Sequence, residues 1–141
     1  MKKKDITILL VDDEPDILEI IRYNLTSEGY TIETAENGLE AIEQAKKVRP
    51  QLIIMDVMMP KMDGIEACEK IRTIPELSET VITFLTARGE DYSQMAGFEA
   101  GADDYITKPI KPKVLVSKVK ALLRRFKDEE EDEKIKLRNL T

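Results

Sequence analysis

Residues 52–56 read Leu52-Ile53-Ile54-Met55-Asp56, a run of four apolar residues that stops at a carboxylate. Three other strand-like runs also stop at a reactive polar side chain: 8–11 before Asp12 and Asp13, 81–85 before Thr86, and 104–107 before Lys108. In an open parallel sheet, ligands bind in the crevice beyond the carboxyl ends of the strands. We therefore expect three carboxylates, a hydroxyl and an ammonium to meet in one pocket.

The segments between these runs have helical periodicity, which is typical of βαβ units around a parallel sheet. The predicted strands cover 6–11, 30–35, 52–55, 80–85 and 104–107. The predicted helices cover 15–28, the segment from an N-cap at Asn37 to Pro50, the segment after Gly64 that carries Ile65, Cys68 and Ile71, 91–100, and 113–126. Right-handed crossovers would place helices on both faces of the sheet.

Composition restricts the class of protein. A chain of 141 residues suits one domain, in which folding buries roughly two-thirds of the surface of the unfolded chain. The net charge is −6, whereas a nucleic-acid groove needs surplus Lys and Arg, so this segment is not expected to bind DNA itself. The single cysteine cannot form an internal disulfide, and neither a signal peptide nor a long apolar span is visible. We expect a cytoplasmic protein without membrane contact.

The end of the chain differs in composition from the rest. Residues 127–134 form a charge run dominated by Asp and Glu, which is too polar to bury a face and indicates a linker or a frayed helix end. Residues 135–141 regain some apolar alternation. We therefore predict one domain over 1–126 and an acidic linker over 127–141.

The three acids predict a site for a hard divalent cation. Carboxylates crowded together repel, which raises at least one pKa unless a cation neutralises them. Mg²⁺ prefers oxygen ligands, and the chain contains no His that would favour zinc. Beside such an ion a carboxylate can attack a phosphoryl group and form an acyl phosphate.

Lys108 and Thr86 fit the product of that reaction. A phosphoryl group adds about −1.5 to −2 charge and three acceptor oxygens, so it needs a cation and a hydroxyl donor nearby. Lys binds phosphate as a point charge. Pro109 directly follows Lys108, and we expect a cis peptide bond between them that points the ammonium into the crevice.

With these residues, the chain resembles the receiver domain of bacterial two-component response regulators. The matching segments are LLVDDEP (9–15), IIMDVMMPKMDG (53–64), TFLTARGE (83–90) and GADDYITKP (101–109). The resemblance extends from residue 6 to about residue 125. It implies an α/β fold, a single doubly wound (βα)5 flavodoxin-like domain with a five-stranded parallel sheet in the order 2-1-3-4-5.

The resemblance also implies roles for the acids. Asp56 would be the phosphoacceptor, and the donor would be a sensor histidine kinase or a small molecule such as acetyl phosphate. Asp13 would bind Mg²⁺ directly, Asp12 through water and Met58 through its backbone carbonyl, with Mn²⁺ as an alternative ion. The domain would assist its own phosphorylation and dephosphorylation and would not be a dedicated metabolic enzyme.

The same resemblance implies a conformational switch. Thr86 and Lys108 would hold the phosphoryl oxygens, and the Thr86 hydroxyl would move toward the new group. The ring of Tyr105 would then turn inward and repack the surface of the fourth helix, fifth strand and fifth helix. Its two arrangements must differ by only a few kcal/mol. Gly89 and Gly101 flank the part that is expected to move.

Two segments, KALLRR (120–125) and GADDYITKP, are most like the OmpR/PhoB-type subfamily, whose receivers dimerise through that surface. Asp103 with Lys118 and Asp104 with Arg125 would form ion pairs between subunits. Phe98 and Val116 would supply an apolar patch. Gln94 and Val114 are uncharged where the subfamily has a further pair, and an exposed pair contributes only about 0 to 1 kcal/mol. We expect a homodimer on phosphorylation.

The resemblance to this subfamily favours a transcriptional output. In the subfamily a winged-helix DNA-binding domain follows the linker, and residues 135–141 resemble the start of its first strand. DNA would then be bound only through that domain, which this chain does not contain. The alternative is a receiver that stands alone and acts by protein–protein interaction. The residues encoded after Thr141 would decide between the two.

Several of these residues also have a purely structural interpretation. Asp12 and Asp13 could cap the helix that begins near Pro15, because acids are favourable at a helix N-terminus. Tyr105 could be a half-exposed strand residue without motion. Arg125 could simply favour the C-terminus of its helix.

Other polar or soft residues are assigned to the fold and not to the site. Asp63 and Gly64 predict a turn and a helix cap. Cys68 lies on an apolar stripe and is expected to be a buried, inert thiol. The methionines of the loop after the third strand are expected to pack, apart from the backbone carbonyl of Met58.

Function classes other than a receiver fit the residues less well. A Mg²⁺-dependent aspartyl phosphatase would need a second acid two residues beyond the nucleophile, where this chain has Met58. A binder of flavin phosphate would need a Gly-, Ser- or Thr-rich loop after the first strand, but this loop presents Asp12, Asp13 and Glu14. A receiver that never accepts phosphate would not need the full set of reactive residues.

Overall fold

The computed structural model describes residues 2–87 and 91–126, and for residues 91–94 it describes the backbone only. Its five strands form one parallel sheet in the order β2-β1-β3-β4-β5, as predicted. The strands are β1 (Thr7–Val11), β2 (Thr31–Ala35), β3 (Leu52–Asp56), β4 (Val81–Thr86) and β5 (Asp104–Thr107). Their bounds differ by about one residue from the expected ones.

Five α-helices alternate with the strands in the described part of the chain. They are α1 (Pro15–Ser27), α2 (Gly38–Val48), α3 (Gly64–Arg72), α4 (Asp91–Ala100) and α5 (Pro112–Leu122). Short 3-10 helices lie at Lys3–Asp5, Pro75–Leu77 and Leu123–Phe126, so α5 ends earlier than expected and continues as a tighter turn. None of the helices has the length and apolar content that a bilayer span requires, within the residues described.

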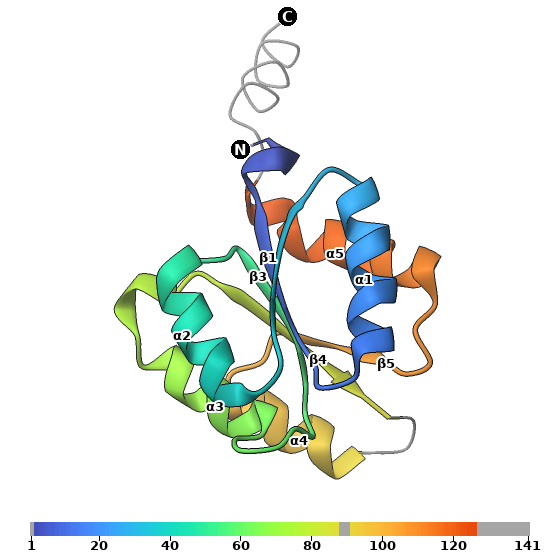
Figure 1. The fold of residues 1–141 in the computed structure, drawn as a ribbon. Helices are drawn as coiled ribbons and strands as arrows, with labels where there is room; N and C mark the ends of the chain where they lie inside the picture. The colour runs from blue at the N-terminus through green and yellow to red at the C-terminus, as the bar shows by residue number, and fades with distance from the viewer. Residues whose placement is uncertain (1, 88–90, 127–141) are drawn as a thin grey trace, which may run out of the picture.

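The helices cover both faces of the sheet (Figure 1). α1 and α5 pack together on one face, and α2, α3 and α4 cover the other. Each face has its own core, because the central strands alternate buried side chains between the two sides: Ile8 and Leu10 point to α1 and α5, whereas Leu9 and Val11 point to α2 and α3. The fold is therefore a doubly wound α/β domain.

Local signals explain where the helices begin and end. The side chain of Asn37 accepts a hydrogen bond from the Glu40 N–H, and Asp63 does the same for Glu66, so both residues are N-caps, as predicted. Gly29 and Gly101 follow their helices with φ of +103° and +109°, a conformation that glycine adopts without a Cβ penalty. Asp63 thus belongs to the helix start and not to a ligand set.

Cys68 lies in α3 within the core between the sheet, α2 and α3. Its Sγ is 3.5 Å from the carbonyl oxygen of Ala100 at the end of α4. Burial raises the pKa of the thiol to about 11. The predicted inert, buried thiol is confirmed.

Candidate functional site

The strand register brings the predicted site residues to one edge of the sheet. Val11 pairs with Met55, so Asp12 lies beside Asp56 where β1 and β3 end. Asp56 pairs with Leu85, and Thr86 pairs with Thr107, which places Lys108 directly after the end of β5. The expected convergence of side chains is therefore present at the carboxyl edge.

Asp56 is buried and is held by two donors. Its Oδ1 accepts a hydrogen bond from the backbone N–H of Met58 at 3.0 Å, and its Oδ2 accepts one from Lys108 Nζ at 2.9 Å. Behind it, α3 begins at Gly64, where a Cβ would overlap the carbonyl oxygen of Asp56. Only a residue without a side chain lets α3 start this close to the carboxylate.

The other acids surround Asp56. Ligand oxygens of Asp12, Asp13, Glu14 and Asp56 all lie within 4.8 Å of one another. Asp12 is fully buried, whereas Asp13 and Glu14 are exposed. One oxygen of Asp12 accepts a hydrogen bond from the Glu14 N–H, and the other has no hydrogen-bond partner among the described residues. Glu14 is the N-cap of α1, and its own side chain makes no cap bond.

The pKa of Asp12 is raised, mainly by its burial. Burial, and after it the nearby charge of Asp56, raise the pKa of Asp12 to about 6, although a backbone hydrogen bond and Lys108 act in the opposite direction. A bound divalent cation would remove this conflict, because it favours the ionised form of each carboxylate. The buried oxygen without a hydrogen-bond partner and the all-oxygen donor set therefore fit a hard cation.

Lys108 is a cation that faces the acids. Its Nζ is 3.5 Å from Asp12 Oδ2 and 3.7 Å from Glu14 Oε1, besides the shorter contact with Asp56. Burial lowers the pKa of Lys108, but the hydrogen bond and charge of Asp56 and the charges of Asp12 and Glu14 outweigh it, so that its pKa is raised. Lys108 thus stays protonated. The peptide bond between Lys108 and Pro109 is cis.

Thr86 and Tyr105 lie beside the pocket on the last two strands. The Thr86 hydroxyl is buried and has no hydrogen-bond partner within the described part of the chain. The Tyr105 ring is only 6% exposed and packs edge-on against Phe98, with the ring centroids 4.7 Å apart. The interpretation of Tyr105 as a half-exposed strand residue is therefore wrong, and the structure shows the ring in an inward position.

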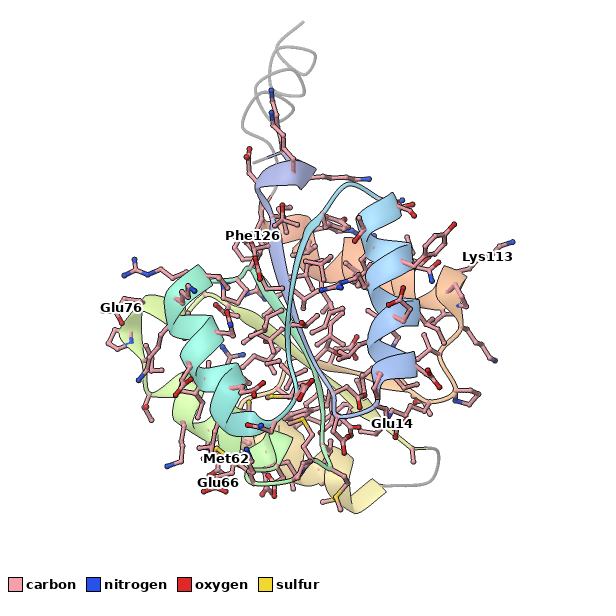
Figure 2. All side chains as sticks on the ribbon, in the orientation of Figure 1. Glu14, Met62, Glu66, Glu76, Lys113 and Phe126 are labelled. Carbon is pink, nitrogen blue, oxygen red and sulfur yellow. The ribbon has the colours of Figure 1, made fainter. Side chains whose placement is uncertain are left out.

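Glu14 and Gly64 are the residues that sequence reasoning did not assign to the site. Figure 2 shows Glu14, at the start of α1, at the same end of the molecule as Met62 in the loop after β3, whereas Phe126 lies at the opposite end. Glu14 directly follows the acidic pair Asp12-Asp13, and this adjacency in the sequence could have indicated that it belongs to the site. For Gly64 the sequence indicates a helix start, but its approach to Asp56 depends on the packing of α3.

The residues expected at the dimer surface are spread over α4, β5 and α5. Phe98 is 52% exposed, but Val116 is half-buried against the core beneath α5. Exposed apolar side chains described on these elements are Met95, Phe98 and Val114. Within the chain, Asp103 contacts Arg72 and Asp104 contacts Lys118, and Arg125 lies exposed in the last 3-10 turn.

Some expectations concern residues outside the described part of the chain. These are the flanking role of Gly89, the side chain of Gln94, and the linker over 127–141.

Comparison with known proteins agrees with this geometry. The profile of the response regulator receiver domain matches residues 8–120. The chain is 46% identical over 125 residues to the alkaline phosphatase synthesis transcriptional regulatory protein PhoP of Bacillus subtilis, covering 89% of this chain and 50% of PhoP. It is 51% identical over 118 residues to the transcriptional regulatory protein ResD of the same organism, covering 84% of this chain and 48% of ResD.

Solved structures give the same result. A putative response regulator from Chloroflexus aurantiacus is 40% identical with a TM-score of 0.80, covering 83% of this chain and 96% of that one. The chemotaxis response regulator CheY4 of Vibrio cholerae is 33% identical with a TM-score of 0.80, covering 84% of this chain and 98% of that one. The chain spans about half the length of the curated relatives it matches. It belongs to the receiver domains of two-component response regulators and, within them, is most similar to regulators of the OmpR/PhoB type.

Proposed function

We propose that this receiver domain accepts a phosphoryl group on Asp56, from a sensor histidine kinase or from a small donor such as acetyl phosphate. The observation that carries the proposal is the position of the Asp56 carboxylate, which lies between an acidic cluster and the Nζ of Lys108. A carboxylate with this surrounding can act as a nucleophile toward phosphorus. Signalling by phosphorylation is the function of the family as a whole.

The transfer step involves one bond formed and one broken. A carboxylate oxygen of Asp56 attacks phosphorus, and the bond from phosphorus to the imidazole nitrogen of the kinase, or to the acetate oxygen, breaks. The leaving group takes the electron pair. The Met58 N–H donates to Oδ1 of Asp56 and so holds the carboxylate in a fixed orientation for this attack.

We propose that Asp12, Asp13, Asp56 and the backbone carbonyl of Met58 hold Mg²⁺, with Mn²⁺ as an alternative. This proposal is supported by the closeness of the acidic oxygens and by the Asp12 oxygen that has no hydrogen-bond partner in the described residues. When bound, the ion would offset negative charge on the transferred group. Glu14 faces the same cluster and adds negative potential that attracts a cation.

Lys108 and Thr86 are proposed to bind the phosphoryl oxygens. Lys108 already contacts Oδ2 of Asp56 and can shift to a phosphoryl oxygen without crossing the pocket. The buried Thr86 hydroxyl has no partner in the part of the chain described, so bonding a phosphoryl oxygen would satisfy it. Tyr105, on the neighbouring strand β5, packs against Phe98 of α4 and would transmit the change to that helix.

The output is proposed to be homodimerisation through α4, β5 and α5, and transcription through a DNA-binding domain that follows 127–141. The support is the similarity to PhoP and ResD, which are transcriptional regulatory proteins roughly twice the length of the matched segment. A receiver that acts alone is the second candidate, because the match to CheY4 covers almost all of that chain. The coding sequence after Thr141 distinguishes them.

The experiment is intact-mass measurement after incubation with acetyl phosphate and Mg²⁺. The wild type should gain one phosphoryl group, and Asp56→Asn should gain none. Asp63→Asn is the matched control, because this acid caps α3 in the next loop and should still leave the protein phosphorylated. EDTA should suppress the modification. An unmodified wild type, or a modified Asp56→Asn, contradicts the proposal, and steady release of phosphate from a small phosphate ester would favour a phosphatase.

A further inference from the structure

A cavity of about 200 Å³ lies at the edge of the sheet opposite Asp56, where α2 leads into β3 and the 3-10 turn Pro75–Leu77 leads into β4. Figure 2 shows Glu76, in this turn, on the α2 side of the molecule and away from Glu14 at the start of α1. The proposed phosphorylation chemistry does not use this cavity. Two residues from the end of α2 and three from the segment before β4 line it: Lys46, Arg49, Ile74, Glu76 and Leu77.

The charged side chains around the cavity do not neutralise one another. Lys46, Arg49 and Glu76 are exposed, and none of them forms an ion pair with any side chain that the structure describes. More than 4 Å therefore separates the nitrogens of Lys46 and Arg49 from the carboxylate oxygens of Glu76. Two cations and one anion thus share one cavity, and each is available to a ligand group of the opposite charge.

Arg49 ends α2 in a strained backbone conformation, with φ of +46° and ψ of +65°. This left-handed region is unfavourable for a residue with a Cβ, and glycine is the usual residue there, as Gly29 and Gly101 show after α1 and α4. A cation is favourable at the C-terminus of a helix, but Lys46 and Lys47 already supply that charge. Backbone strain of this kind is typical of functional sites, so the arginine indicates a use for its side chain. A guanidinium can donate two parallel hydrogen bonds to one carboxylate.

The rest of the cavity lining is apolar. Leu77 is only 1% exposed and belongs to the core between the sheet, α2 and α3, and Ile74 packs half-buried against that core. A ligand in the cavity thus meets apolar surface beside charges of both signs, a lining that suits an amphipathic molecule better than an inorganic ion. The volume is below the roughly 300 to 1,000 Å³ of sites for drug-sized ligands, which restricts the ligand to a small molecule.

We propose that this cavity binds a small zwitterion with an apolar side chain, that is, a free α-amino acid of the leucine or isoleucine type. Its carboxylate would bind Lys46 and Arg49, and its ammonium group would bind Glu76. Its side chain would cover Ile74 and Leu77. A zwitterion fits because its two ends carry the opposite charges that the cavity keeps apart. The site is independent of the proposed phosphorylation, so binding needs neither a phosphoryl group nor Mg²⁺.

The first test is a titration of the unphosphorylated full chain with leucine, followed by NMR of the backbone amides. Saturable shifts should concentrate at the end of α2 and at residues 74–77, with a Kd of about 0.1 to 10 mM, as expected for a small ligand held by exposed charges. Leucinamide lacks the carboxylate and 4-methylpentanoate lacks the ammonium group, so each should bind at least about threefold more weakly. Absence of saturable shifts up to about 100 mM leucine would overturn the proposal. Equal binding of 4-methylpentanoate would overturn the assignment of a zwitterion.

The second test uses Arg49→Gly, because this change separates binding from stability. It should raise the Kd for leucine by about fivefold or more, whereas the urea midpoint should stay the same or rise, since glycine relieves the left-handed backbone. Lys46→Gln and Glu76→Gln should each raise the Kd by about two- to fivefold. Lys47→Gln, an exposed position on the same helix outside the cavity, is the matched control and should leave the Kd unchanged. A lower urea midpoint with unchanged leucine binding in Arg49→Gly would show that the arginine serves only the fold and would overturn the proposal.

Discussion

Asp12 is the most deeply buried acid of the pocket, and its ionisation lowers the stability of the folded chain. Because its folded pKa of about 6 lies above the value of about 3.9 in unfolded chains, the folded state binds its proton more tightly. The resulting stabilisation is complete below about pH 4 and is lost as the pH rises through about 6. An uncharged side chain of the same shape at position 12 would retain this stabilisation at neutral pH.

We therefore expect Asp12→Asn to raise the free energy of unfolding at pH 7.5 in EDTA by about 1 to 3 kcal/mol. At pH 4, where the wild-type acid is protonated, the difference should shrink toward zero. Urea unfolding at both pH values measures this, with the exposed Asp13→Asn as the control of smaller effect. A gain of the same size at pH 4 would show that the cause is not ionisation.

The packing of α4 against β4 and β5 depends on Gly97. A Cβ at Gly97 would overlap the hydroxyl oxygen of Tyr105 and would lie 2.8 Å from Cδ2 of Phe84. In an isolated helix the change to alanine would be favourable by about 0.8 to 1 kcal/mol. In this fold the overlap should outweigh that gain, because Phe84 is fully buried and has no room to move.

For Gly97→Ala we expect a net loss of about 1 to 2 kcal/mol in the free energy of unfolding. The near-UV circular dichroism should also change, because the Tyr105 ring must leave its place against Phe98. Glu99→Ala, an exposed position on the same helix, is the control and should be neutral or slightly stabilising. An increase in the free energy of unfolding for Gly97→Ala would contradict this prediction, because it would show that α4 can shift away from Tyr105 and Phe84 without loss of stability.

At the end of the domain opposite the pocket, Glu28 ties α1 to α5 and to the first turn of the chain. It lies 3.0 Å from Lys120 Nζ and 3.7 Å from Lys3 Nζ. The hydrogen bond to Lys120, followed by the charges of Lys120 and Lys3, lowers the pKa of Glu28. Its contribution to stability is therefore present above the ordinary pKa of glutamate and is lost as the pH falls through the lowered value.

Glu28→Gln should accordingly lower the urea midpoint at pH 7 and low salt. The difference should shrink in high salt, which screens exposed charges, and should disappear in acid. Thermal or urea unfolding across salt and pH measures this. Glu43→Gln, on an exposed site of α2, is the control, and an equal effect there would remove any special role of Glu28.

The strands and helices are predictable because their signals are local. The central strand β3 is buried on both faces and is read as an unbroken apolar run, and Asn37 and Asp63 mark helix starts by their own side chains. Arg72 is different, since its three acceptors lie 8 to 31 residues away and no local pattern indicates them. The 3-10 turn at Pro75–Leu77 also has no periodic signal.

At the scale of the whole molecule, too, some features of the site are predictable from the sequence and others are not. Convergence of Asp12, Asp56 and Lys108 is predictable because parallel strands must end at one edge, and the register confirms it. The contact of Glu14 with the cluster depends on how α1 leaves β1, and the inward ring of Tyr105 depends on the missing side chain of Gly97. These details arise from packing between elements and not from any single stretch of sequence.

The described residues up to Phe126 already form a hydrophobic core on each face of the sheet, which is the basis of a prediction for the molecule as a whole. A chain ending at Phe126 should keep the urea midpoint of the full chain and should still gain a phosphoryl group on Asp56. Intact mass and urea unfolding of the two chains side by side measure this. A large loss of stability in the shorter chain would contradict the proposed domain boundary.

The burial of Cys68 has a practical consequence for following the proposed switch. Since the one native thiol is shielded and hardly ionised at neutral pH, a maleimide reagent should leave it untouched in the folded protein. A cysteine introduced on the exposed side of α4 or α5 would then be the single attachment point for a fluorophore or spin label. Movements of these helices could be recorded without first removing the native residue and disturbing the core around it.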